Sequence, residues 1–322
     1  MKKVLITGGS GLIGLELCKQ LIEKKFKVIC MDLPEQLEKN KNLFKKVKKN
    51  KNLKILNGSI FEKSLLNKVI SDVDAVFHLA AMLGVKRTED NKLKCLEVNV
   101  KGTENILEAC VSGNIKHIIF ASSSEVYGEP SHNPINEKTD TQGKTVYGIS
   151  KLAGEEYVKA YCQIYKKLNY TIVRFFNTYG ENQVSQFFLA KIVRNIMSGS
   201  DPIIYGDGQQ VRSFCHVEDT CRALIEIVKN KKSYNKIFNI GNSNEKYTLN
   251  EVAKIAIKTL KKNNLKIKNL PFTKSDRTVN REIFKRFCDV SLAKKTFNFQ
   301  PKISIEEGIK RISKNLNFHN DW

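Results

Sequence analysis

Short apolar runs alternate with longer amphipathic segments through the first half of the chain. Between several of the runs, apolar side chains recur at helical spacing, most clearly in residues 92–113 and 147–168. Strands that are apolar throughout and are separated by helices are typical of a parallel sheet covered on both faces. We therefore expect an α/β fold with a doubly wound parallel sheet. The runs of strand length are residues 3–9, 27–32, 53–58, 75–81, 117–124 and 171–177.

After about residue 178 this alternation breaks up. A helical pattern at 185–199 is followed by short apolar runs at 202–206 and 236–241. We expect a main domain over residues 1–178 and a smaller, mixed α/β lobe over residues 179–322. The sequence has no low-complexity linker between them, so strands could cross from one to the other.

The first strand is followed by a glycine-rich turn, TGGSGLIG, at residues 7–14. A turn that lacks Cβ atoms at Gly8, Gly11 and Gly14 lets the backbone approach a pyrophosphate, and the N-terminus of the next helix then faces that anion. Asp32 ends the second strand. Its carboxylate could accept hydrogen bonds from both ribose hydroxyls and would repel a 2′-phosphate. A glycine-rich turn with a capping aspartate is the simpler alternative. The order strand, glycine turn, helix favours a Rossmann-type domain that binds NAD rather than NADP.

Tyr147 and Lys151 are four residues apart in a predicted helix, which places both side chains on one face. An ammonium group beside the phenol should lower the tyrosine pKa from about 10, so that Tyr147 could act as a base near neutral pH. Ser123 ends the preceding strand and could hold a substrate hydroxyl. A tyrosine–lysine pair at a helix surface is the alternative without catalysis.

Composition narrows the class of protein. The net charge of +22 comes mainly from lysine, and the densest run, residues 39–52, has no arginine and almost no aromatic residue. We interpret this run as a solvated connection with a short helix, and we expect no nucleic-acid partner. The eight cysteines form no CxxC pair and the histidines show no metal-ligand spacing, which predicts free thiols in a reducing compartment and no metal. The sequence shows neither a signal peptide nor an apolar run of membrane-spanning length, so we expect a cytoplasmic protein.

Taken together, the motifs show that the chain resembles the extended short-chain dehydrogenases/reductases of the nucleotide-sugar epimerase/dehydratase family over nearly its whole length. The sequence departs from the family at Ser59, where aspartate is often found near the adenine. The motifs that carry the resemblance are TGGSGLIG, Asp32, NGSI, HLAA, NVKGTENILEA, SSSEVYG, YGISK, RFFNTYG, YGDGQQVRSFCHVEDT and PKISIEEGIKR.

The resemblance implies a role for each matching position. Tyr147 would deprotonate a sugar hydroxyl, usually the one at C4, while the hydride passes to NAD. Ser123 would hold that oxygen, and Lys151 would bind the nicotinamide ribose. The NAD site would comprise Gly8, Gly11, Leu12, Ile13, Gly14, Asp32, Ser59, Ile60, Leu79, Ala80, Ala81, Tyr147 and Lys151.

The expected substrate is a nucleotide sugar linked to UDP, GDP, dTDP or CDP. Ser124, Asn177, Arg212 and Arg286 match positions that bind it in relatives, although the two arginines could instead form structural ion pairs. The resemblance also implies a homodimer built from the helices at 92–110 and around Tyr147.

Glu125 is the residue that plain 4-epimerases of this kind do not need. In a strand, Ser123 and Glu125 would point the same way, so Glu125 could enter the pocket. Related 4,6-dehydratases use a glutamate here as the base at C5, but the dTDP-glucose type has an aspartate where this chain has Ser124. GDP-mannose-type dehydratases and UDP-glucuronate decarboxylases both match residues 123–125, and the decarboxylases also carry an arginine that matches Arg286. Epimerisation, dehydration and decarboxylation all stay open.

We therefore expect an NAD-dependent nucleotide-sugar epimerase/dehydratase that works through a transient 4-keto sugar. UDP-glucuronate decarboxylation is the close alternative. A non-catalytic, NAD-sensing or polyanion-binding protein on the same fold is an alternative of another class. The joint presence of Ser123, Tyr147 and Lys151 argues against it, because a sensor does not need a base.

Overall fold

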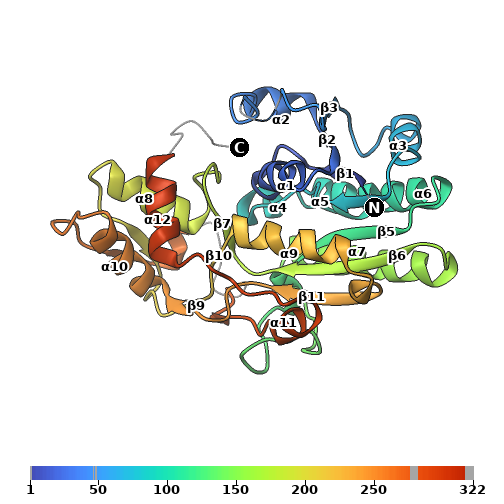
Figure 1. Cartoon of the computed structure of the whole chain (residues 1–322). Helices are drawn as coiled ribbons and strands as arrows, with labels where there is room; N and C mark the ends of the chain where they lie inside the picture. Colours follow the sequence, from blue (N-terminus) through green and yellow to red (C-terminus); the bar gives the residue numbers. More distant parts are fainter. Residues whose placement is uncertain (1, 46, 48, 276–281, 316–322) are drawn as a thin grey trace.

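A seven-stranded parallel sheet forms the centre of the computed structural model, which describes residues 2–45, 47, 49–275 and 282–315 (Figure 1). The strand order is β11–β6–β5–β4–β1–β2–β3, and every neighbouring pair is parallel. The expected doubly wound parallel sheet is confirmed. The strands are β1 (Lys3–Thr7), β2 (Lys27–Asp32), β3 (Leu53–Asn57), β4 (Ala75–His78), β5 (His117–Ser123), β6 (Asn169–Phe175) and β11 (Lys236–Ile240).

Helices cover both faces of this sheet. Val4 and Ile6 of β1 pack into one apolar cluster with α1 (Leu12–Glu23) and α9 (Val217–Lys229), whereas Leu5 faces the opposite cluster with α3, α6 and α7. All three side chains are fully buried, which explains why the strand is apolar along its whole length. The helices of the second face are α3 (Lys63–Ile70), α6 (Gly102–Ser112) and α7 (Val146–Ile164). Among the described residues, none of the helices combines the length and the apolar character that crossing a bilayer requires.

Shorter elements connect these layers. They are α2 (Pro34–Lys39), α4 (Val85–Asp90), α5 (Lys92–Leu96), a π-helical turn (Glu97–Lys101) and 3₁₀ turns at Ser124–Tyr127, Lys231–Ser233 and Phe272–Lys274. The lysine-rich run after α2 is less solvated than we expected. The ring of Phe44 is only 2% exposed, and it packs into the cluster that contains α1.

Most of the remaining elements form a smaller lobe, on the left in Figure 1, whereas α11 (Ser291–Phe297) packs against β11 and α9 of the main domain. The core of the lobe lies between α8 (Phe188–Met197), α10 (Leu249–Thr259) and α12 (Ile305–Lys314) and includes Ile192, Val252 and Ile309, all fully buried. The other elements outside the main sheet are β7 (Thr178–Tyr179), β8 (Ile203–Tyr205), β9 (Val211–Arg212), β10 (Cys215–His216), β12 (Tyr247–Thr248), β13 (Lys268–Leu270) and β14 (Lys285–Arg286).

The chain returns from the second half of the sequence to the main sheet. Strand β11 pairs with β6 at the edge of the sheet, and α9 packs against α1 on its face. Residues 217–240 therefore belong spatially with the first half. This crossing ties the lobe to the main sheet.

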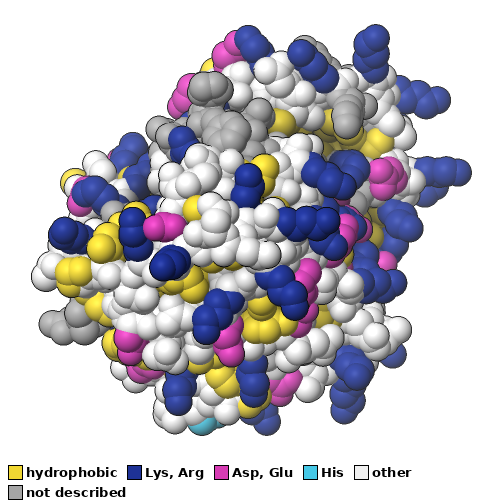
Figure 2. Space-filling model, turned by 90° about the vertical axis from the view of Figure 1, so that its left-hand side faces the viewer, with side chains coloured by type: hydrophobic (Ala, Val, Ile, Leu, Met, Phe, Trp, Pro, Cys, Tyr) yellow, Lys and Arg dark blue, Asp and Glu magenta, His cyan; other side chains and the backbone are white. Residues whose placement is uncertain are grey.

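Basic side chains are distributed rather than concentrated on the face shown in Figure 2. Lysines and arginines lie there among acidic side chains. Surface charge that is mixed in this way favours solubility and does not outline a polyanion site on that face.

Candidate active site

A cleft of about 2270 Å³ runs past the carboxyl ends of the central strands and continues into the lobe. Ligands bind at this edge in open α/β sheets, because loops from neighbouring strands diverge there. Every residue that the sequence assigned to catalysis, to the cofactor or to the substrate lines this one cleft, although those residues come from both halves of the chain.

The glycine-rich turn forms a close-packed cradle at one end of the cleft. Gly8 adopts φ +68°, and a Cβ atom on Gly14 would lie 2.4 Å from the carbonyl oxygen of Gly8. Helix α1 begins directly after Gly11, and no side chain caps its first amides. These amides can therefore donate hydrogen bonds to a negatively charged pyrophosphate, so the turn fits a dinucleotide.

Asp32 is held beside this turn. One carboxylate oxygen accepts hydrogen bonds from the amide and the hydroxyl of Ser10, at 2.9 and 2.6 Å, and the other accepts one from the amide of Leu33 at 2.9 Å. The carboxylate is thus fixed at the cleft wall, where a ribose would lie next to the pyrophosphate. Ser59, the departure from the family pattern, also lines the cleft, and its hydroxyl accepts a hydrogen bond from the amide of Phe61 at 3.2 Å.

Helix α7 presents Tyr147 and Lys151 toward the end of β5. The helix begins after Thr145, whose hydroxyl accepts a hydrogen bond from the amide of Gly148 at 3.1 Å. The ammonium group of Lys151 is buried, donates to the carbonyl oxygen of Ala121 at 2.8 Å and lies 6.0 Å from the centre of the Tyr147 ring. Burial lowers the pKa of Lys151 to about 8.

The expected lowering of the Tyr147 pKa is not found. Burial raises this pKa above its usual value, the negative charge of Glu125 raises it further, and a hydrogen bond with Ser123 acts in the opposite direction. The physical reason is that a buried phenolate loses its hydration, while the Lys151 ammonium donates to a backbone carbonyl and not to the phenol.

Glu125 reaches the cleft by a different route from the one we expected. Strand β5 ends at Ser123, and residues 124–127 form a 3₁₀ turn, so strand alternation does not aim the two side chains together. Instead, the turn brings the amide of Glu125 to the hydroxyl of Ser123, at 3.2 Å. The carboxylate is buried and forms an ion pair with Arg286, which also lies 3.4 Å from the side-chain oxygen of Asn177.

Arg286 and Arg212 are direct neighbours. They pair in register on the parallel strands β14 and β9. Arg212 forms an ion pair with Glu282 and donates to the carbonyl oxygen of Phe284 at 3.2 Å. Like charges on adjacent strands repel each other, and the two glutamates offset this repulsion. Both arginines therefore form the ion pairs that we considered as the alternative, and both also line the cleft.

Asn99 is a buried polar residue that the sequence did not reveal as part of this region. It lies in the π-helical turn, and its amide nitrogen donates to the Ser150 hydroxyl and to the Met82 carbonyl oxygen, both at 2.9 Å. Its side-chain oxygen accepts from the amide of Met82 at 2.7 Å. We predicted an unbroken helix here, because π turns leave no strong periodic signal, although they occur often at functional sites.

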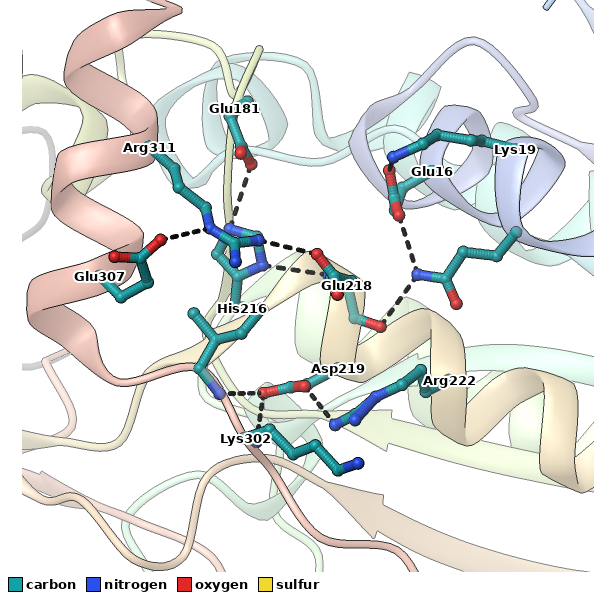
Figure 3. A network of polar contacts seen from close by, with 12 residues as sticks. Glu16, Lys19, Glu181, His216, Glu218, Asp219, Arg222, Lys302, Glu307 and Arg311 are labelled. Carbon is teal, nitrogen blue, oxygen red and sulfur yellow. Dashed lines mark hydrogen bonds and ion pairs between the residues drawn. The ribbon is translucent and has the colours of Figure 1, made fainter. Parts of the chain in front are cut away.

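The far rim of the cleft is held by a polar network between α1, α9 and α12 (Figure 3). The His216 ring accepts a hydrogen bond from the amide of Glu218 at 3.3 Å, and its other nitrogen lies 3.1 Å from a carboxylate oxygen of Glu181. Arg311 of α12 pairs with the Glu218 side chain at 2.8 Å, and Gln20 of α1 donates to the Glu218 carbonyl oxygen at 3.1 Å. The network fixes the lobe against the helix that follows the glycine-rich turn.

Comparison with known proteins places this site in a family. The model of the NAD dependent epimerase/dehydratase family matches residues 4–241. The chain belongs to this family. It is an NAD-dependent nucleotide-sugar epimerase/dehydratase, and its cofactor is NAD, as the sequence led us to expect.

Similar proteins carry out more than one reaction. Over 318 residues, covering 96% of each chain, the enzyme is 34% identical to a putative UDP-glucose 4-epimerase of Methanocaldococcus jannaschii. With the same coverage it is 35% identical to a UDP-N-acetyl-alpha-D-glucosaminuronate decarboxylase of Bacillus cytotoxicus. Among solved structures, it resembles the UDP-N-acetylglucosamine 4-epimerase of Methanobrevibacter ruminantium M1 in complex with UDP-N-acetylmuramic acid, with a TM-score of 0.87, 29% identity and 97% of each chain covered.

Proposed function

We propose that the enzyme is a UDP-sugar 4-epimerase that works through a transient 4-keto sugar. One observation carries the choice of reaction: the Glu125 carboxylate is committed to Arg286, which leaves Ser123, Tyr147 and Lys151 as the set that can act on the sugar. When bound, NAD accepts the hydride from C4 and returns it to that carbon.

The three side chains have complementary tasks at the C4 oxygen. Tyr147 takes the proton of the C4 hydroxyl, and Ser123 hydrogen-bonds the same oxygen and keeps it beside the phenol. Lys151 would bind the ribose next to the nicotinamide through its ammonium group, which donates to the carbonyl oxygen of Ala121 and not to the phenol. The keto sugar then rotates in the cleft, so that the opposite face of C4 is presented to the nicotinamide. Tyr147 returns the proton to the C4 oxygen in this second orientation.

Dehydration fits the site less well. A base at C5 has to take up a proton, and protonated Glu125 would leave the buried guanidinium of Arg286 without its counter-charge. Dehydration also needs an acid for the departing C6 oxygen, and Ser124, which precedes Glu125, has no acidic proton near neutral pH.

Decarboxylation of a UDP-uronate is the second candidate. It is supported by Arg286, which lies beside Glu125 in the cleft, and by the decarboxylase of Bacillus cytotoxicus at 35% identity. A 4-keto uronate is a β-keto acid, so carbon dioxide can leave without a base at C5. Arg286 would then orient the carboxylate of the substrate.

The choice of UDP rests on the relatives, whereas the cleft supports a nucleoside diphosphate. Each of the three relatives described above has a UDP-sugar in its name. Arg212 and Arg286 lie side by side and can share the charge of a diphosphate.

We also propose a homodimer built from α5 and α7. Four apolar side chains on these two helices are exposed, and Leu93 and Ile164 are exposed to 81% and 71%. A two-fold contact between these helix pairs would cover all four side chains. The other two are Leu96 and Ile149.

We place the enzyme in the cytoplasm. All eight cysteines are free and buried, which suits a compartment that keeps thiols reduced.

Product analysis tests the proposed reaction. The purified enzyme is incubated with UDP-glucose, UDP-N-acetylglucosamine, UDP-glucuronate and UDP-N-acetylglucosaminuronate, and the products are identified by mass and NMR. We expect an isomer of unchanged mass that is inverted at C4. Loss of carbon dioxide from either uronate would select the second candidate, and loss of water would overturn both.

A further inference from the structure

A buried ion pair lies directly beneath the segments that carry the proposed catalytic residues. Glu155 is one helical turn beyond Lys151 on α7, and its carboxylate accepts two hydrogen bonds from Arg174 of β6, at 2.9 and 2.6 Å. The Ser122 hydroxyl of β5 donates to the same carboxylate. The side chain of Glu155 is fully buried, and Arg174 is only 4% exposed.

The pair reaches two further segments through Arg174. The guanidinium lies 4.7 Å from the centre of the Tyr127 ring, at the end of the turn that contains Glu125. The Tyr127 hydroxyl donates at 2.7 Å to Asn239 of β11. One cluster therefore joins α7, β5, β6, β11 and the turn at 124–127, and three of these segments carry Tyr147, Lys151, Ser123 and Glu125.

Stability alone does not require such a pair. Two buried charges lose their hydration, and apolar residues of similar volume are often as stable or more so. A bidentate arginine–carboxylate contact instead fixes the position of the helix, because both hydrogen bonds form at only one position of α7. Ser122 and Arg174 are already register partners on β5 and β6, so the contact fixes how α7 lies across these two strands.

We propose that Glu155 and Arg174 are positioning residues: they hold α7 on β5 so that Tyr147 and Ser123 meet at one substrate oxygen, and Glu155 supplies a counter-charge for Lys151. The proposal rests on the C4 chemistry described above. It adds a second layer of residues that touch neither substrate nor cofactor.

The electrostatic part follows from the surroundings of Lys151. Burial lowers the pKa of Lys151 to about 8, whereas Cys95 and Glu155 raise it. Without Glu155 the pKa of Lys151 falls further, so the ammonium loses its proton at a lower pH. Activity that needs the charged lysine then declines at a lower pH. The other titratable groups that interact with Lys151 or with the ion pair are Tyr147, His78, Tyr127, Glu137 and Tyr170.

Three variants separate positioning from stability. The double variant Glu155→Met with Arg174→Met removes both charges and keeps the volume of the core. Ser122→Ala removes one hydrogen bond and changes no charge. Glu156→Gln is the matched control, since Glu156 is the next residue of α7, is exposed and pairs with Lys159 at the surface. Each protein is assayed for melting temperature, kcat and KM with UDP-glucose or another sugar that the enzyme turns over, and the dependence of kcat on pH.

We expect the double variant to fold and to lose roughly tenfold or more in kcat, because small misplacements of reacting groups are costly. Its KM should stay within about twofold, and its alkaline limb should move to lower pH. Ser122→Ala should show a smaller loss in kcat, and Glu156→Gln should match the wild type. A folded double variant with wild-type kcat and pH profile would overturn the proposal. If the double variant does not fold, an unchanged kcat in Ser122→Ala overturns it.

A second readout needs no turnover. Crystal structures of the wild type and of the folded variants, Ser122→Ala included, show whether Tyr147 keeps its place relative to Ser123. We expect α7 to shift along β5 in the variants but not in Glu156→Gln. If no sugar in the panel reacts with the wild type, the proposed function is wrong. The positioning role is then tested by these crystal structures. A Tyr147 that does not move would then count against it.

Discussion

Glu125 and Arg286 are separated by 161 residues in the sequence and form a buried ion pair in the wall of the cleft. The pair joins the turn after β5 to the lobe strand β14. It explains how a carboxylate can lie beside the proposed catalytic serine without acting as a base.

Glu125→Gln tests this explanation. Glutamine keeps an acceptor for Arg286 but removes the counter-charge, so we expect a loss of stability of about 3 kcal/mol and a fall in kcat of less than about tenfold. Because Glu125 raises the pKa of Tyr147, the acid limb of the rate profile should move to lower pH. The control is Glu129→Gln, at a half-exposed glutamate of the next loop. Accumulation of NADH and a 4-keto sugar in Glu125→Gln would identify Glu125 as the base at C5 and contradict the epimerase.

Tyr147→Phe tests the assignment of the base. Phenylalanine keeps the ring and its packing but removes the group that accepts the proton. We expect a loss of about 10²-fold or more in kcat with NAD still bound. Tyr161→Phe, on the same helix but outside the cleft, serves as the control. Turnover close to that of the wild type would show that another residue takes the proton.

Leu93→Glu tests the dimer. Leu93 lies on α5 and is almost fully exposed in the single chain, so a charge there should prevent an apolar two-fold contact. We expect light scattering to show a dimer for the wild type and a monomer for the variant. Met197→Glu places a charge on a partly exposed apolar site of α8 and should leave the assembly unchanged. A wild type that is monomeric at assay concentrations would be evidence against the interface.

The burial of two histidines should make the free energy of unfolding depend on pH. Burial lowers the pKa of His78 and of His117 from 6.5 to about 3. Between these values the unfolded chain binds protons that the folded chain does not, so stability is lost as the pH falls from about 6.5 toward 3. Each histidine contributes a slope of up to about 1.4 kcal/mol per pH unit. Urea unfolding at several pH values measures this dependence. The free energy of unfolding of His117→Gln should change less steeply with pH than that of the wild type, and an equal dependence would contradict the prediction.

The sequence predicted best what depends on local patterns. The apolar runs located all seven strands of the main sheet, although we assigned the run at 236–241 to the lobe, and the four-residue spacing placed Tyr147 and Lys151 on one helix face. Short-range patterns could not show that β5 ends at Ser123, because the next residue, Ser124, is also a serine and nothing in the sequence separates the strand from the turn. They also gave no sign of the π-helical turn at Asn99.

Contacts between distant residues were beyond the reach of these patterns. The partners of Arg212 and Arg286 come from segments that meet only in the folded chain. The edge strand β11 comes from the second half, and its pairing with β6 depends on the long return of the chain from the lobe. The pKa of Tyr147 could not be foreseen either, since it depends on how deeply the phenol is buried.

The proposed epimerase changes only the configuration at C4 of the sugar. The reaction of a UDP-sugar that it accepts, run in deuterated water, tests this most directly. An epimerase returns the same hydride to C4, so we predict a product of unchanged mass, inverted at C4, with no deuterium on carbon. Dehydration and decarboxylation both pass through a carbanion at C5 that takes a proton from solvent or from an exchanging side chain. Deuterium at C5, together with the loss of water or carbon dioxide, would contradict C4 epimerisation.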